Sequence, residues 1–365
     1  MNMWEKGISA FVGLHHSLDT LRCYLQLAQK YGYTRLFTSL HIPEADPNLL
    51  LSNFQIFVND AKSLGYSITA DISPQALTLL GGTLSDAASL KALGLSALRL
   101  DYGFSPEQIA AFTHSSGIEV ELNGSTVTSG ILQQLYEAKA DFTKIRACHN
   151  YYPRPETGLS FPLFAQRSKL LREYDIPVFA FIPSLSSPRG PIFAGLPTLE
   201  KHRHLSPELA AKELLASELV DGLLFGDPLV AETELAAIAA LQATCMELKV
   251  TVNPNASMTE QKILFAEHTN RIDPGEGVIR SQEARNLCSS IIPPRTATPR
   301  QIGAVTIDNQ DYLRYMGEMQ IIQSPLPADP RVNLAAQVIP EEIFLLSYLS
   351  PGKSFRLKEQ TKHES

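Results

Sequence analysis

The chain has 365 residues, of which 44% are hydrophobic and 19% charged, and its formal net charge is −7. This length suits one large and one smaller domain, and the composition is that of a globular protein. The acidic balance argues against a general nucleic-acid-binding protein, which would carry a basic stripe. The four cysteines lie far apart without a CxxC pair, so neither a disulfide framework nor a zinc knuckle is expected.

The first residues, MNMWEKGISAFVG, contain Glu5 and Lys6 and no long apolar run. They therefore do not resemble a signal peptide. No later window is apolar over the length that a membrane helix needs. Scattered thiols are typical of a reducing compartment. We expect a cytoplasmic protein with no membrane partner.

Short runs of strand-forming residues alternate with amphipathic, helix-period segments over the first two thirds of the chain. The runs occupy 7–13, 35–41, 67–73, 97–103, 118–125, 144–152, 178–184 and 222–227. Successive strand–helix units predict a parallel sheet, and a count of eight predicts a closed (β/α)₈ barrel. A doubly wound open sheet is the alternative. It is disfavoured because no GxGxxG or GxxxxGK[ST] motif occurs.

The pattern changes near residue 247 to short strand candidates separated by turns rich in Pro, Gly, Asn and Asp. The candidates are 247–254, 262–270, 304–308, 318–323, 333–339 and 355–359. They predict a small β-rich domain, either a barrel or a sandwich. We therefore divide the chain into a catalytic domain over 1–246 and a β domain over 247–365.

Charged residues alternate with leucines along LRLDYG, the fourth predicted strand. In a (β/α)₈ barrel, alternate strand residues point into the interior, and those at the carboxyl ends of strands face the catalytic mouth. Arg99 and Asp101 are thus expected to point inward. The same alternation places further polar residues inside the barrel or at its mouth: Ser39, His41, Thr69, Asp71, Glu119, Glu121, Asn123, His149 or Asn150, and Asp227.

The acids near the mouth suggest chemistry, because burying unpaired carboxylates is costly. Two carboxyl groups facing each other cleave glycosidic bonds, one protonating the leaving oxygen. Neighbouring acids also raise one pKa, which suits a general acid. A buried ion network is the alternative for the lower residues, with Arg99 neutralising Asp101 or Glu119.

The loop after the seventh strand, 183–204, combines hydroxyls, glycines and basic residues, among them Ser184, Arg189 and Thr198. Such groups match a phosphate or carboxylate, and late barrel loops are frequent phosphate sites. A solvated basic loop is the alternative. The rings of Tyr151 and Tyr152 are suited to stacking on a sugar, or to holding a Tyr-Pro turn. No histidine pair has a third ligand at a known spacing, so we expect no metal.

Several segments together resemble one bacterial family: FTSLHIPE, DISP, LRLDYGF, ELNGST, CHNYYPRPETGLS, RGPIFAGLPTLEKHR and IDN…RYMGEMQI…DPRVN. The family is the 6-phospho-N-acetylmuramidases, glycoside hydrolase family 170, and the similarity covers nearly the whole chain. It implies an α/β fold, a (β/α)₈ TIM barrel followed by a small cyclophilin-like β-barrel domain. The implied reaction is cytoplasmic hydrolysis of N-acetylmuramic acid 6-phosphate–N-acetylglucosamine in peptidoglycan recycling, without a cofactor.

On this basis the catalytic candidates are Asp101 and Glu121, with Asp71 and Glu44 in reserve. The substrate-binding candidates are Ser39, His41, Arg99, Asn123, His149, Asn150, Tyr152, Ser184, Arg189, Thr198, Asp227 and Arg331. The N-acetyl group of the substrate also permits substrate-assisted catalysis. The resemblance includes a Gly-Arg-Tyr turn near RYMGEMQI, where this chain has Tyr312-Leu313-Arg314-Tyr315.

Three other functions remain open from the sequence. A PLP-dependent racemase would need a lysine at the end of the first strand, and Lys6 precedes that strand. A sugar-phosphate sensor would bind without turnover, and a lyase would act on a related disaccharide. The expected partner is a small phosphorylated amino-sugar disaccharide; nucleic acid is not expected, and a homo-oligomer is compatible with the sequence.

Overall fold

The computed structural model describes residues 4–14, 16–40, 47–72, 91–100, 103–115 and 117–360. The chain forms two compact units, Met1–Ala240 and Leu241–Ser365, and each is described by itself. Within the described residues, no helix combines the length and the apolar character needed to cross a membrane.

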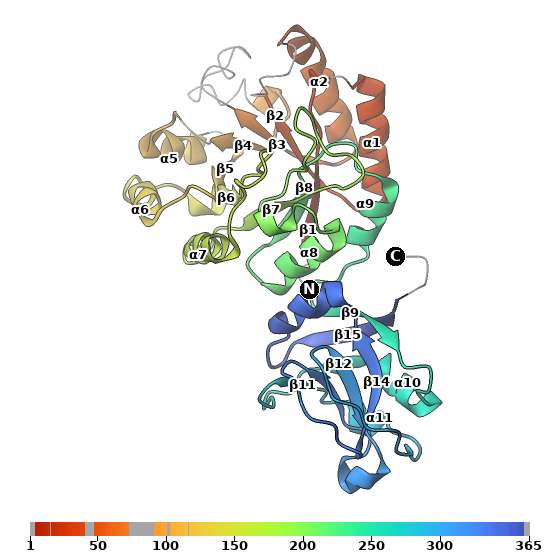
Figure 1. Cartoon of the computed structure of the whole chain (residues 1–365). Helices are drawn as coiled ribbons and strands as arrows, with labels where there is room; N and C mark the ends of the chain where they lie inside the picture. Colours follow the sequence, from red (N-terminus) through yellow and green to blue (C-terminus); the bar gives the residue numbers. More distant parts are fainter. Residues whose placement is uncertain are drawn as a thin grey trace. The chain divides into compact units, whose positions relative to one another are not determined.

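The first unit is a closed barrel of eight parallel strands, β1 to β8, paired in chain order. Helices surround these strands (Figure 1). The predicted (β/α)₈ barrel is thus confirmed, and the open sheet is wrong. The strands are β1 (Glu5–Ser9), β2 (Arg35–Ser39), β3 (Ser67–Ile72), β4 (Ala97–Leu100), β5 (Glu119–Asn123), β6 (Ile145–Cys148), β7 (Val178–Ile182) and β8 (Gly222–Phe225). The helices are α1 (Leu18–Lys30), α2 (Pro47–Ser63), α5 (Pro106–Ser115), α6 (Ser129–Glu137), α7 (Phe161–Arg172), α8 (Pro207–Ala216) and α9 (Glu232–Ala239), with 3₁₀ turns η1 (Phe142–Lys144) and η2 (Glu200–His202).

Several barrel helices begin at a hydroxyl residue that caps them. The side chains of Ser17, Thr128 and Ser206 accept hydrogen bonds from the backbone N–H groups of Thr20, Ile131 and Leu209. Each bond satisfies one of the N–H groups that lack a partner within the helix. These local signals explain why the helices begin where the sequence periodicity begins.

One side of the barrel interior is apolar. Phe37 of β2 packs across the barrel against Phe181 of β7, with ring centroids 5.2 Å apart, and both belong to a buried cluster with Phe11 and Phe179. Gly7 of β1 leaves room for this cluster, since a Cβ there would lie 2.6 Å from Leu224 Cγ. Aromatic packing therefore fills the interior near β1, β2, β7 and β8, whereas the buried charged residues Arg99, Glu121 and Arg146 lie on β4, β5 and β6.

The second unit contains a seven-stranded sheet in the order β10-β15-β9-β14-β12-β13-β11. Strands β9 and β15 pair in parallel and the other pairs are antiparallel. The strands are β9 (Cys245–Val252), β10 (Glu267–Thr269), β11 (Val278–Arg280), β12 (Ala304–Asp308), β13 (Met319–Ile322), β14 (Val332–Val338) and β15 (Ser354–Glu359). The remaining elements are α10 (Met258–Leu264), α11 (Ala284–Leu287), η3 (Gln310–Tyr315) and η4 (Pro340–Tyr348).

The β-rich character of this unit agrees with the prediction, but one predicted strand is partly wrong. Segment 262–270 begins as the last turn of α10, and only Glu267–Thr269 is a strand. The cause is local: Ser257 and Glu260 form a capping box that starts the helix.

Candidate active site

A row of alternately charged side chains crosses the polar side of the barrel. The strand register places Ser39 beside Asp71, Asp71 beside Arg99, Arg99 beside Glu121, and Glu121 beside Arg146. This face is the interior, because Phe37 lies two residues before Ser39 and packs across the barrel. Neighbouring strands lie about 5 Å apart, so each carboxylate in the row has a guanidinium next to it.

Arg99 is the centre of the row and is almost fully buried, with 2% of its surface exposed. Its Nη1 donates to Glu121 Oε1 at 3.3 Å and to the Cys148 carbonyl at 2.8 Å, while Nη2 donates to Asn150 Oδ1. Of the two partners expected from the sequence, Glu119 pairs with Arg146 instead, and Asp101 lies outside the described residues. The register decides this, since Glu121 is the residue directly across from Arg99 on β5.

Glu121 lies between two arginines. Its Oε2 is 3.5 Å from Arg146 Nε, and Arg146 Nη1 is 2.9 Å from Glu119. Burial raises the pKa of the Glu121 carboxyl, and the positive charge of Arg99 acts against that shift. Only 4% of Glu121 is exposed, so its carboxylate oxygens contact other side chains of the protein and not solvent. The structure thus contains a buried ion network, as the sequence offered for Arg99 and Glu119, but its buried carboxylate is Glu121.

We expect Glu121→Gln to lower the free energy of unfolding by about 3 kcal/mol, because it removes the carboxylate from a buried pair and leaves a charged arginine behind. Urea unfolding of the full chain measures this. The matched control is Glu119→Gln, whose carboxylate also pairs with Arg146 but is 46% exposed, and we expect it to cost less than about 1 kcal/mol. Equal losses in the two variants would contradict the buried network.

Asp71 ends the row on β3 and is only half-buried. Its Oδ2 accepts a hydrogen bond from Ser39 Oγ at 3.3 Å. Its charge contributes to raising the pKa of Glu121 and of Tyr151, which places it near both groups. Among the carboxyl candidates that the structure describes in the interior, Asp71 is the one that solvent reaches at the carboxyl end of its strand.

Arg189 lies on the loop after β7, and its guanidinium covers two aromatic rings. The distance is 4.9 Å to the Phe11 ring and 5.2 Å to the Tyr151 ring, and Nη1 donates to the Tyr151 hydroxyl at 3.2 Å. No carboxylate of the described residues forms an ion pair with it. A half-buried arginine without a carboxylate, at the carboxyl ends of β1 and β6, suits an anionic ligand.

Asp227 and Glu234 hold the loop that carries Arg189. Asp227 is fully buried, and its carboxylate accepts the backbone N–H groups of Ser184, Arg189 and Leu196. Glu234 accepts from the Ser184 hydroxyl at 2.6 Å and from the Leu185 N–H at 2.9 Å. We therefore infer that Asp227 and Ser184, both expected to touch substrate, position the loop instead.

Thr198 also acts within the protein. Its fully buried hydroxyl accepts from the Phe181 N–H at 2.8 Å and donates to the Asn150 carbonyl at 2.9 Å. It joins the loop to β7 and holds the chain just after β6, where Asn150 points to Arg99. Asn123 ends β5, and its Oδ1 accepts from the Ser125 N–H at 3.0 Å.

His149 points away from the barrel interior. Its imidazole lies against α7, with Nε2 3.0 Å from Ser168 Oγ and the ring 4.6 Å from that of Phe164. Of the two alternatives left by the sequence, Asn150 is the inward residue. Burial lowers the pKa of His149 to about 3, with a smaller contribution from Arg99.

This buried histidine makes a testable contribution to acid sensitivity. In the unfolded chain it takes up a proton below the ordinary histidine pKa of 6.5, whereas in the folded chain its lowered pKa keeps it neutral to about pH 3. Stability from this group is therefore complete near pH 7 and is lost as the pH falls. Between about pH 7.5 and about pH 4.5 we expect a loss of about 3 kcal/mol. His149→Gln should remove that part of the pH dependence in urea unfolding, and an unchanged slope would refute the assignment.

The remaining candidates from the sequence do not join the row of charged side chains in the described part of the barrel. The backbone of Tyr152 is held by the Pro197 carbonyl and by Arg203, so its loop is braced. Arg331 belongs to the second unit. The candidates Asp101, His41 and Glu44 lie outside the described residues.

The sequence analysis missed Arg146, and it considered Tyr151 only as a ring that could stack on a sugar. The signal for Arg146 was present, because an inward Asn150 implies that Arg146, four residues earlier on the same face, is inward too. Tyr151 follows the strand and falls outside this alternation, and only the folded loop brings it to Arg189.

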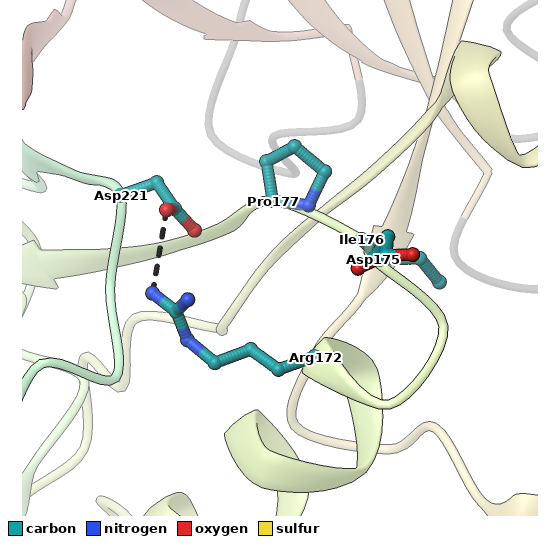
Figure 2. Close-up of a pocket in the computed structure, with 5 residues that line it drawn as sticks. All are labelled: Arg172, Asp175, Ile176, Pro177 and Asp221. Atoms are coloured by element: carbon teal, nitrogen blue, oxygen red, sulfur yellow. Dashed lines mark hydrogen bonds and ion pairs between the residues drawn. The ribbon is translucent and has the colours of Figure 1, made fainter. Parts of the chain in front are cut away.

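Figure 2 shows a separate pocket of the barrel unit. It is lined by Arg172, Asp175, Ile176, Pro177 and Asp221, and an ion pair of 3.3 Å joins Arg172 to Asp221. Pro177 and Asp221 precede β7 and β8, so this is the amino-terminal end of the strands. Catalysis in this fold takes place at the carboxyl end, and we assign the pocket to the structural face.

Comparisons with known proteins cover nearly the whole chain. Two family models match it, described as 6-phospho-N-acetylmuramidase, N-terminal, over residues 6–240, and C-terminal, over residues 246–358. A crystal structure of an uncharacterized B. cereus protein is similar, with 30% identity, a TM-score of 0.89, and coverage of 98% of this chain and 99% of that one. A conserved Enterococcus faecalis protein of unknown function shares 37% identity, with a TM-score of 0.75 and coverage of 98% and 96%. No curated protein matches this chain significantly.

Proposed function

This chain belongs to the 6-phospho-N-acetylmuramidase family, and we propose that it hydrolyses the glycosidic bond of N-acetylmuramic acid 6-phosphate–N-acetylglucosamine. The observation that supports this most is the row of alternating charges inside the barrel, which ends in a solvent-reached carboxyl, Asp71. Asp71 lies at the carboxyl end of the barrel strands, where enzymes of this fold act. An anion-ready arginine, Arg189, lies at the same end.

We propose Asp71 and Asp101 as the reacting pair, one protonating the leaving oxygen and the other acting on the sugar or on water. Glu121 was preferred from the sequence. Its oxygens lie against Arg99, Arg146 and Thr69, so we now give it a positioning role, holding Arg99 in place. Glu44 stays in reserve.

The phosphate of this substrate explains why the guanidinium of Arg189 has no carboxylate partner among the described residues. A phosphate at O6 presents two oxygens that one arginine binds with two parallel hydrogen bonds. Arg189 is already oriented by the two rings and by Tyr151, so little side-chain freedom is lost on binding. We propose Arg189 as the ligand of the 6-phosphate, with Ser39 and Asn150 near the reacting sugar.

We also propose that the reaction belongs to cytoplasmic peptidoglycan recycling and that the second unit has a cyclophilin-like arrangement. All four cysteines are free thiols, which suits a reducing compartment. No cofactor, nucleic acid or membrane enters the proposal, and it is compatible with a homo-oligomer.

Product analysis of the full chain with this disaccharide tests the proposal. In water labelled with heavy oxygen, hydrolysis releases N-acetylglucosamine and N-acetylmuramic acid 6-phosphate carrying the label at its anomeric carbon. A lyase would instead form an unsaturated or unlabelled product. Saturable binding with no product would support a sensor and overturn the hydrolase.

A further inference from the structure

A second group of polar side chains gathers at one end of the sheet in the second unit. Asp308 ends β12, and its N–H donates to the Glu318 carbonyl at 3.0 Å, just before β13. The next residue, Asn309, donates to the Arg331 carbonyl at 2.9 Å, just before β14. The turn η3 follows directly. We call this set, with Asp329, Tyr312 and Leu313, the Asp308 cluster.

Asp308 has no partner for its carboxyl group. Only 6% of the residue is exposed, yet no described residue donates a hydrogen bond to its side-chain oxygens. Burial, together with the charges of Glu318 and Asp329, raises its pKa to about 7. Neither oxygen is among the fully buried side-chain atoms that lack a partner, so a ligand can reach the carboxyl group, and groups with a shifted pKa are concentrated at functional sites.

The other two carboxylates of the cluster are already paired. Glu318 lies 2.8 Å from Arg280, and Asp329 holds Arg331 through both of its oxygens at 2.9 and 2.8 Å. The cluster is therefore unsuited to a metal ion, and among the described residues no group of three or more His, Cys, Asp or Glu is arranged to hold one. The open acceptor needs a ligand that brings its own hydroxyl or amide group.

Arg331 is held in place with part of its guanidinium unused. It lies 4.3 Å above the Tyr312 ring, and its Nε and Nη2 are occupied by Asp329. No described residue accepts a hydrogen bond from Nη1. Nη1 is therefore the part of this guanidinium that remains to donate a hydrogen bond to a ligand carboxylate.

Leu313 follows Tyr312, whose ring lies under Arg331, and its backbone conformation is unfavourable. It is 79% exposed, with φ 54° and ψ −118° inside η3. This region is adopted readily by glycine and is strained for other residues, by about 1–3 kcal/mol. An exposed leucine held this way has no packing that would offset the strain, which suits contact with an apolar part of a ligand.

We propose that Asp308, Arg331 and Leu313 form a second binding site, for a sugar that carries a carboxylate. Asp308 exchanges hydrogen bonds with a ring hydroxyl, Arg331 Nη1 binds the carboxylate, and Leu313 contacts a methyl substituent. N-acetylmuramic acid carries all three groups. This inference uses residues of the second unit alone and does not rest on the proposed hydrolase reaction.

Methyl NMR of the full chain, labelled at leucine, tests the site. The Leu313 signals are identified by their loss in Leu313→Ile. We expect them to shift saturably with N-acetylmuramic acid, and at least about tenfold more weakly with N-acetylglucosamine, which lacks the carboxylate. Asp308→Asn and Arg331→Gln should each weaken binding about tenfold or more. The matched control is Arg356→Gln, an exposed arginine of β15 paired with Glu267, which should bind as the parent does.

Several results would overturn the site: no shift with either sugar, or unchanged affinity in Asp308→Asn and Arg331→Gln chains whose other methyl signals show an intact fold. Asp71→Asn separates this site from the barrel, because its Leu313 signals should still respond. Loss of the response in Asp71→Asn would overturn the claim that the second unit binds on its own. Hydrolysis measured on the same samples fails or succeeds independently of these shifts.

Discussion

Replacing Asp71 by asparagine is expected to lower kcat about a thousandfold, because the amide neither transfers a proton nor carries the negative charge of the carboxylate. KM should change little, since asparagine keeps the size of the side chain and still accepts a hydrogen bond from Ser39. Steady-state kinetics on the phosphorylated disaccharide measure both constants. Thermal unfolding of the variant establishes that the barrel is intact.

Two further variants sharpen this test. Asp101→Asn should produce a loss of similar size, as the partner carboxyl. Asp175→Asn makes the same substitution in the pocket drawn in Figure 2, whose residues precede β7 and β8, and should leave kcat unchanged. Its positive φ of 55° is tolerated by asparagine. Near-parent turnover in Asp71→Asn would remove Asp71 from the reacting pair.

Arg189→Gln is expected to lower kcat/KM for the phosphorylated disaccharide about a hundredfold, mainly through KM, because a charge-assisted pair of hydrogen bonds to the phosphate is lost. With the unphosphorylated disaccharide the same variant should differ from the parent by less than about threefold. The comparison of the two substrates separates phosphate binding from a general disturbance of the loop.

The control for this prediction is Arg172→Gln, an arginine that pairs with Asp221 far from the barrel mouth. It should leave the kinetics of both substrates unchanged. Arg189→Lys should restore only part of the affinity, since an ammonium group does not form the two parallel bonds of a guanidinium. If Arg189→Gln weakened both substrates equally, the 6-phosphate would have to bind elsewhere.

The barrel was predictable because its signals are local. Eight runs of strand-forming residues, each followed by a helix-period segment, can be recognised from the order of residues along the chain without any long-range contact. The alternation within LRLDYG also placed Arg99 inside, and the contacts of Arg99 with Glu121 and Asn150 agree. Where local signals competed, as at 262–270, the capping box of Ser257 and Glu260 prevailed over strand propensity.

The partners within the site were not predictable in the same way. Arg99 meets Glu121 because β4 and β5 pair in one register and no other, and a shift of two residues would have matched it with Glu119 or Asn123. Asp227 looked like a substrate ligand, yet the loop folds back so that three N–H groups reach its carboxylate. These contacts join residues 31 to 43 positions apart, which no local pattern reports.

The sequence by itself determined the strand–helix order, the two units and the inward faces of β3, β4 and β5, because these follow from periodicities of two and 3.6 residues. Only the tertiary structure decided which carboxyl is buried between arginines and which is reached by solvent. Glu121 and Asp71 are alike in sequence terms, both inward acids near strand ends. They differ in their neighbours on the adjacent strands. Glu121 lies between Arg99 of β4 and Arg146 of β6, whereas Asp71 lies between Arg99 and the uncharged Ser39 of β2.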